Sequence, residues 1–175
     1  MTPAEIMLAP SQAVRALWIA AAAAAILAAV WIFQALGYAP CELCLAQRYA
    51  FYAAVPLALL TAALARPSTH GLARAGFALL VLVFAANTVL AAYHAGVEYH
   101  WWPGPTACTG ALTGPLDVND LAKAVNSEKV VRCDEVQLKI AGLSLAGWNV
   151  VASAVLAVYA ALAAREAPAN TAAQA

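Results

Sequence analysis

Residues 16–36 read ALWIAAAAAAILAAVWIFQAL, a run without a single charged side chain. A helix of about 20 apolar residues crosses the roughly 30 Å hydrocarbon core of a bilayer. Three further apolar runs occupy residues 49–65, 75–97 and 140–164. The sequence therefore predicts an all-α integral membrane protein, a bundle of four transmembrane helices that forms one domain over residues 1–175.

The composition also indicates a membrane protein. Hydrophobic residues make up 65% of the chain, whereas a soluble domain has about 45–50% apolar residues. Nine basic residues balance nine acidic ones, and no run is rich in Lys and Arg. Because nucleic acids are bound by clusters of basic side chains, we expect no nucleic-acid partner. The expected surroundings are the lipid bilayer.

The distribution of charge predicts which side of the membrane each loop faces. An even number of spans places both termini on one side. The turn from Arg66 to Arg74 holds two arginines, a histidine and no acid, whereas residues 98–139 hold six acids against four bases. Because cytoplasmic loops carry the excess of Lys and Arg, we expect cytoplasmic termini and two outer loops, at residues 37–48 and 98–139.

The second outer loop contains a predicted surface helix. Within residues 117–125, apolar side chains recur at helical spacing, namely Val118, Leu121, Ala122 and Val125. A short amphipathic helix of this kind lies in the membrane interface. The expected fold is therefore a four-helix bundle with one short amphipathic helix in its second outer loop.

All four cysteines fall in the predicted outer loops, as two pairs. Cys41 and Cys44 form a C-x-x-C motif in the first loop, and Cys108 and Cys133 lie in the second. A C-x-x-C motif lowers the pKa of one thiol, and thiol–disulfide exchange can pass electrons from one pair to the other. The four cysteines therefore predict a membrane-embedded thiol–disulfide enzyme, with all four as catalytic residues.

Arg48 lies four residues after Cys44. If the second helix begins near the C-x-x-C motif, Cys44 lies in its first turn, where free N–H groups favour a thiolate. Arg48 then projects from the same face, where a guanidinium lowers the thiol pKa further and can bind the carbonyl oxygen of an electron acceptor. A membrane quinone fits that position. The alternative is an arginine that reaches out to the lipid headgroups.

Two other interpretations of the cysteines remain open at this point. The four thiols could hold a structural zinc ion, although four-cysteine zinc sites have two closely spaced pairs and Cys108 and Cys133 are far apart. Alternatively, a disulfide between Cys108 and Cys133 could be an inert staple. Closing a loop of that length contributes about 3.5 kcal/mol by the chain-entropy estimate. Beside a C-x-x-C motif, a redox pair is the favoured interpretation, and no metal is expected.

Four short motifs follow one another along the chain: CELC at 41–44 with QRY at 47–49, PTACTG at 105–110, RCD at 132–134, and GLSLAGWN at 142–149. Together they resemble the DsbB family of quinone-dependent disulfide oxidases, and the similarity covers about residues 14–164. Glu42 departs from the apolar residue expected between the two cysteines. Because a nearby acid raises the pKa of a thiol, the redox potential of this pair is open.

The resemblance implies a bacterial inner-membrane enzyme with its cysteine loops in the periplasm. A reduced DsbA-like partner, a periplasmic thioredoxin-fold protein, would attack Cys108, and Cys133 would then attack Cys41 and release Cys44 as a thiolate. Cys44 and Arg48 would bind ubiquinone or menaquinone and pass the electrons on. The implied reaction oxidises a protein dithiol and reduces a membrane quinone.

Further polar residues lie in or near the spans. His94 is a candidate quinone-binding residue near the outer end of the third span, and Glu98 is a weaker one. Asn87 and Asn149 are expected to form hydrogen bonds between helices.

Rival functions also follow from the sequence. A vitamin K epoxide reductase has its loop cysteines before the C-x-x-C motif, the reverse of the order here. A scaffold or small transporter would need more polar residues at mid-membrane depth. A specialised DsbB relative that serves one dedicated partner is not separable by sequence from a general oxidase.

Overall fold

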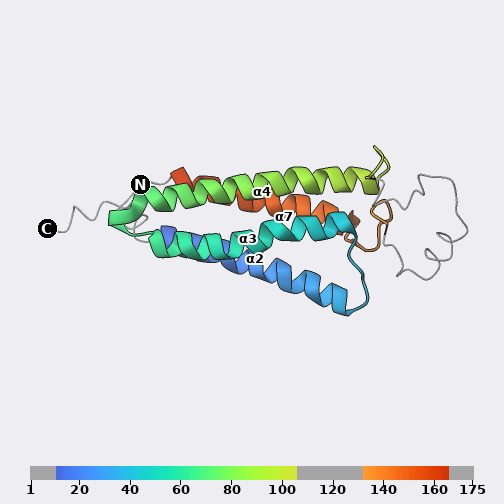
Figure 1. Ribbon diagram of the computed structural model, residues 1–175, viewed down its shortest axis with the longest axis horizontal. Coiled ribbons are helices and arrows are strands. Elements are labelled where there is room, and N and C mark those ends of the chain that lie inside the picture. The colour runs from blue at the N-terminus through green and yellow to red at the C-terminus, as the bar shows by residue number, and fades with distance from the viewer. Residues whose placement is uncertain (1–10, 106–131, 166–175) are drawn as a thin grey trace, which may run out of the picture.

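Four long helices form the bundle (Figure 1). The computed structural model describes residues 11–105 and 132–165, and the four helices in them are α2 (Gln12–Ala35), α3 (Glu42–Leu64), α4 (His70–Glu98) and α7 (Leu145–Arg165). Each is long and apolar enough to cross a membrane. This confirms the predicted four-helix membrane bundle. The amphipathic helix predicted for residues 117–125 lies outside the described residues.

The two ends of the bundle differ. At one end, the short 3-10 helix η1 (Pro67–Thr69) joins α3 to α4, and α2 begins beside the last turn of α7, where the Gln12 side chain donates to the carbonyl of Ala163 at 3.5 Å. At the other end lie the connection from α2 to α3 and a small hairpin before α7 (Figure 1). The start of α2 and the end of α7 are therefore at the same end of the bundle, as an even number of spans requires.

Helix α3 begins seven residues before the apolar run that predicted it. Cys41 is its N-cap, and the sulfur accepts a hydrogen bond from the backbone N–H of Cys44 at 3.3 Å. Apolarity alone excluded the first two turns because the second contains Gln47 and Arg48, yet both side chains are buried in the bundle. The C-x-x-C motif therefore starts a transmembrane helix.

Helix α7 begins five residues later than its apolar run. Strand β1 (Lys139–Ile140) pairs antiparallel with strand β2 (Leu143–Ser144), and the two turn residues, Ala141 and Gly142, have φ values of 50° and 82°. Two consecutive positive φ values are those of the tight hairpin turn that suits the twist of paired strands. Ser144 then caps α7, because its Oγ accepts from the N–H of Gly147 at 3.1 Å.

The main core packs small residues against a few aromatic rings. It consists of Ala16, Ile19, Ala20, Ala23, Phe51, Ala54, Ala58, Phe77, Leu80, Phe84, Leu156, Ala160 and Ala163. Small side chains let membrane helices approach closely. At Gly76 the helices are too close for a larger side chain, because a Cβ atom there would lie 2.3 Å from Oγ1 of Thr61. This core fills the half of the bundle that holds the termini and leaves the other half to different side chains.

Candidate redox site

The first cysteine pair lies at the N-terminus of α3. Cys41 and Cys44 are free thiols, and their sulfurs are 2.9 Å apart. Cys41 is 3% exposed, whereas Cys44 is half-buried. The N-cap geometry holds the two sulfurs together, because the sulfur of Cys41 accepts the N–H of the residue that carries the other sulfur. The pair is therefore poised for dithiol–disulfide exchange.

In this reduced pair, Cys41 is the thiol whose pKa is lowered. The Cys44 thiol donates a hydrogen bond to its sulfur and, with a smaller effect from His94, lowers the pKa of Cys41 to about 5 against the opposing effect of burial. The sequence predicted the thiolate at Cys44 instead. The difference arises chiefly because the Cys44 thiol donates to the sulfur of Cys41, and the backbone N–H of Cys44, which Cys41 accepts as the N-cap, adds a smaller effect. The exposed side chain of Glu42 is not among the groups that shift the pKa of Cys41.

Cys133 lies against the first pair. Its side chain is 1% exposed and belongs to a buried cluster with Cys41, Leu43 and Val97. Cys133 is disulfide-bonded, whereas Cys41 and Cys44 are free. A zinc site that uses all four thiols is therefore wrong for this state of the protein. Cys108 lies outside the described residues.

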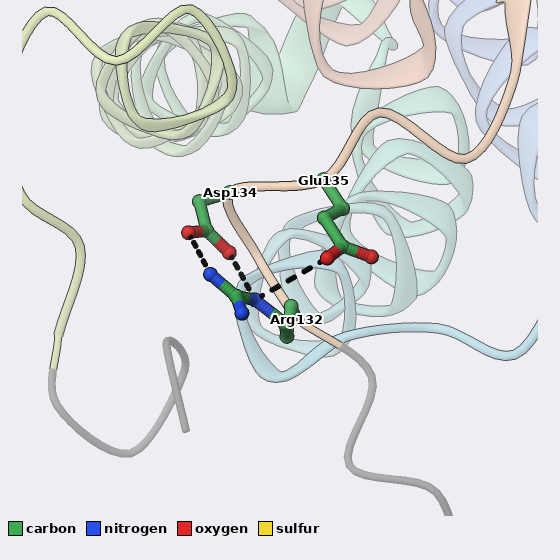
Figure 2. Close-up of polar contacts among 3 residues, drawn as sticks. All are labelled: Arg132, Asp134 and Glu135. Atoms are coloured by element: carbon green, nitrogen blue, oxygen red, sulfur yellow. Dashed lines mark hydrogen bonds and ion pairs between the residues drawn. The ribbon is translucent and has the colours of Figure 1, made fainter. Parts of the chain in front are cut away.

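Charged side chains surround the backbone at Cys133. Figure 2 shows the guanidinium of Arg132 between the carboxylates of Asp134 and Glu135. Its Nη2 is 2.7 Å from Asp134, and its Nε is 3.5 Å from Glu135. Farther along, the side chain of Gln137 donates to the carbonyl of Ala39 in the first loop at 2.9 Å. The segment that carries Cys133 is thus held across the loop that carries Cys41.

A cavity of about 400 Å³ opens beside Cys44. Its apolar wall comes mainly from α2 and α7, with Ile26, Leu27, Val30, Phe33, Leu145 and Trp148. Its polar lining includes Arg48, His94, Glu98 and Asn149. The volume is within the range of pockets that bind small molecules, and a mostly apolar lining with a few polar groups is typical of them. A flat, apolar ring with polar oxygens fits this combination.

Arg48 is inside the bundle rather than at the headgroups. It is 9% exposed, its Nη1 donates to Oε1 of Gln34 at 2.8 Å, and its guanidinium lies 5.8 Å from the centre of the Trp31 ring. No carboxylate within residues 11–105 and 132–165 forms an ion pair with it. Since a guanidinium has five N–H donors, several remain for a ligand in the cavity. This burial argues against an arginine that reaches out to the lipid.

Gln34 is a site residue that the sequence analysis missed. It lies near the end of α2 and orients Arg48 across the wall of the cavity. The signal was available, because Gln34 is the only amide side chain in the apolar run 16–36. Polar side chains within membrane spans are costly and usually have a function.

His94 and Glu98 lie one helical turn apart on α4. His94 is 2% exposed and lies 3.5 Å from the sulfur of Cys41 and 2.8 Å from the side-chain amide of Gln47. Glu98 is 9% exposed, and its buried Oε2 has no hydrogen-bond partner in the part of the chain that the structure describes. A buried oxygen of this kind is costly unless a ligand satisfies it. Both residues line the cavity.

Cys41, Cys44 and His94 also bring three possible metal donors within 4.8 Å of one another. Two thiolates on one tetrahedral zinc ion are about 3.8 Å apart, whereas these sulfurs are 2.9 Å apart. Structural zinc sites also have four donors, and the cluster among the described residues has three. The geometry suits a dithiol better than a metal centre.

A dithiol that joins a disulfide-bearing loop to an apolar cavity defines a membrane thiol–disulfide oxidoreductase. The family model for the disulfide bond formation protein DsbB matches residues 11–163. Disulfide bond formation protein B of Aromatoleum aromaticum (strain DSM 19018 / LMG 30748 / EbN1) is 31% identical over 133 residues, which cover 75% of this chain and 78% of that protein. No solved structure matches. The chain belongs to the DsbB family.

Proposed function

We propose that this protein oxidises the dithiol of a DsbA-like thioredoxin-fold partner and passes the electrons to a membrane quinone. One observation carries the proposal. Disulfide-bonded Cys133 packs in one cluster with Cys41, while the neighbouring Cys44 faces an apolar cavity that contains Arg48. The disulfide that accepts electrons from a thiol and the cavity that suits an apolar oxidant therefore both adjoin the pair formed by Cys41 and Cys44.

The partner-side steps use the second cysteine pair. A thiolate of the partner attacks Cys108, forms a mixed disulfide and releases Cys133 as a thiolate. When the first pair is oxidised, Cys133 attacks Cys41, breaks the Cys41–Cys44 bond and frees Cys44 as a thiolate. The partner's second thiol then displaces Cys108, and the partner leaves with its disulfide formed.

The relay then returns to the state of this structure. Cys108 attacks Cys133, which reforms the loop disulfide and leaves Cys41 and Cys44 with the two electrons. In the structure Cys133 is disulfide-bonded and the first pair is reduced.

The residues around the cavity fit a quinone. When bound, ubiquinone or menaquinone supplies the two-electron oxidant that returns Cys41 and Cys44 to a disulfide. Arg48 has free N–H donors for a quinone oxygen, and the unpaired Oε2 of Glu98 can hold a proton at the cavity wall. His94 lines the same wall as the third predicted quinone-binding side chain.

The proposed location is the bacterial inner membrane, with the cysteine end of the bundle in the periplasm. Arg66, His70 and Arg74 lie at the opposite end, in or beside the connection from α3 to α4, where α2 also begins and α7 ends. Since Lys and Arg are enriched in cytoplasmic loops, that end faces the cytoplasm. Membrane-impermeant maleimide added to reduced spheroplasts should label the cysteines before lysis, whereas labelling only after lysis would reverse this orientation.

The division of roles between the pairs is tested by Cys133→Ser. With the resolving thiol gone, the partner should stay covalently attached to Cys108, and a non-reducing gel should show the adduct. Cys108→Ser is the matched control and should show none. An adduct that maps to Cys41 would contradict the proposed order of the two pairs.

A further inference from the structure

A line of polar side chains continues from Cys41 into the bundle. His94 on α4 contacts the sulfur of Cys41 through Nε2, at 3.5 Å, and Gln47 on α3 through Nδ1, at 2.8 Å. The carbonyl oxygen of Gln47 accepts from the side-chain N–H of Asn149 on α7. Three helices thus contribute to one connected set of hydrogen bonds, and none of these side chains is free to rotate alone.

The hydrogen bonds of Asn149, at the end of this line farthest from Cys41, determine how each side-chain amide in it is oriented. Oδ1 of Asn149 accepts from Oγ of Ser153 at 3.2 Å and from the side-chain amide of Asn87 at 3.4 Å. Asn87 also donates to Ser153 at 2.9 Å. With its oxygen on that side, Asn149 turns its NH2 group to Gln47. The oxygen of Gln47 is then engaged, so Gln47 turns its own NH2 group to His94.

An amide NH2 group donates hydrogen bonds and accepts none. Nδ1 of His94 must therefore accept, and the single ring proton of the neutral imidazole is on Nε2, the nitrogen that faces Cys41. We propose that Asn149 and Gln47 are positioning residues that hold His94 in its Nε2–H tautomer, so that His94 donates a hydrogen bond to the sulfur of Cys41.

This tautomer makes His94 a stabiliser of the Cys41 thiolate rather than a base that takes its proton. Among the described residues, the other titratable or charged groups around the sulfur and the cavity are Cys44 on α3, Glu98 on α4 and, across the cavity, Arg48, Arg132 and Glu135. Cys44 has the largest effect and His94 adds to it in the same direction. A protonated Nε2 also has no lone pair for a metal ion, which agrees with the sulfur spacing.

The arrangement gives Asn87 and Asn149 a second role. Each amide within a membrane span is costly, and a direct hydrogen bond between two helices would account for both. Here the pair also fixes the orientation of Gln47, and through it the proton of a histidine beside the reactive sulfur. The inference concerns the reduced enzyme alone and needs neither partner nor quinone.

Nitrogen-15 NMR of histidine-labelled protein tests the tautomer directly. The chain has three histidines, and variants His70→Gln and His100→Gln assign the signals of His94 by elimination. In the reduced protein, Nε2 of His94 should be protonated and Nδ1 not. In Asn149→Asp, the carboxylate can only accept, so Gln47 should turn its oxygen to His94 and the ring proton should move to Nδ1.

The reactivity of the Cys41 sulfur provides a second readout. The pH dependence of Cys41 alkylation, mapped by mass spectrometry, should move about one pH unit higher in Asn149→Asp, since a hydrogen bond to a charged group is lost. If that variant does not fold, Asn149→Leu should show both tautomers and a smaller shift in the same direction. Thr88→Val is the matched control, because the one partner of its hydroxyl among the described residues is the carbonyl of Phe84 in its own helix.

Two results would overturn the proposal. One is a proton on Nδ1 of His94 in the unaltered protein. The other is an Asn149→Asp protein whose histidine signals and alkylation profile both equal those of Thr88→Val. Because neither experiment uses a partner protein or a quinone, failure here leaves the proposed electron transfer untouched.

Discussion

The two halves of the bundle bury different kinds of side chain. In the half with the termini, the interior is Ala, Ile, Leu and Phe, and the buried polar side chain that the structure describes there, Thr61, bonds to its own helix at Leu57. In the cysteine half, the buried side chains include Gln47, Arg48, Asn87, His94, Glu98, Ser144 and Ser153. One half is built as a membrane core and the other as a polar site within the membrane.

This difference means that one half of the bundle chiefly stabilises the fold and the other carries the reactive groups. Packing of small residues is enough to hold membrane helices together, so the terminal half needs no polar network. Polar groups in the other half are expensive in a bilayer and must be satisfied by one another or by a ligand. Substitutions in the cysteine half should therefore change reactivity, and substitutions in the terminal half should change the free energy of unfolding.

The largest expected effect is at Arg48. Arg48→Ala removes the charge-assisted hydrogen bond to a quinone oxygen, worth about 1.5–3 kcal/mol, so the apparent KM for quinone should rise about 10- to 100-fold. Arg48→Lys should recover only part, since lysine lacks the planar fork. Arg66→Ala, at the other end of the bundle, is the control. If Arg48→Ala, Arg48→Lys and Arg66→Ala all had the same apparent KM for quinone, Arg48 would have no role in quinone binding.

The next effect concerns the pH dependence of Cys41. Its pKa, lowered to about 5 chiefly by the Cys44 thiol, means that the reactive thiolate predominates at neutral pH. The rate of Cys41 alkylation in the reduced protein should be nearly constant above about pH 6 and should fall about tenfold per pH unit below pH 5. An alkylation rate that still rises between pH 7 and pH 9 would show that Cys41 has the pKa of an ordinary thiol. The polar groups of the cysteine half would then have no effect on its reactivity.

The smallest expected effect on chemistry comes from the terminal half. Gly76→Leu places a side chain where Thr61 already lies, and overpacking of this kind costs about 1–3 kcal/mol of unfolding free energy. Gly71→Leu, where a Cβ atom has open space, is the matched control. Thermal unfolding in detergent should separate the two variants, while their Cys41 alkylation profiles should agree. A changed profile in Gly76→Leu would mean that the halves are coupled.

Apolar runs were enough to predict the four helices but not where two of them begin. The run that predicted α3 starts at residue 49, because hydropathy counts Gln47 and Arg48 as loop, while the helix reaches back to Glu42. The run for α7 includes residues 140–144, which form a hairpin and a cap instead. Both differences lie at the cysteine end, where side chains face a site rather than lipid.

The candidate site was predictable in its residues but not in its connections. Spacing singled out the C-x-x-C motif and Arg48. The hydrogen bonds between helices expected of Asn87 and Asn149 are present, and one of them joins these two residues at 3.4 Å. The link from Asn149 through Gln47 to His94 was not predictable, because it depends on how three helices are rotated against one another. The lowered pKa of Cys41 likewise depends on the contacts of its sulfur, chiefly with the Cys44 thiol and then with His94, and the spacing of the motif does not fix these contacts.

The most direct test of the central claim counts electrons. Purified protein in detergent, without oxygen, is mixed with a reduced DsbA-like thioredoxin-fold protein and a short-chain ubiquinone, and quinone absorbance and partner thiols are followed together. The account predicts one quinone reduced for each partner disulfide formed, and no reaction with Cys44→Ser. Partner disulfides that form while the quinone absorbance stays unchanged would contradict the claim that the cysteine end of this bundle joins a protein dithiol to a membrane quinone.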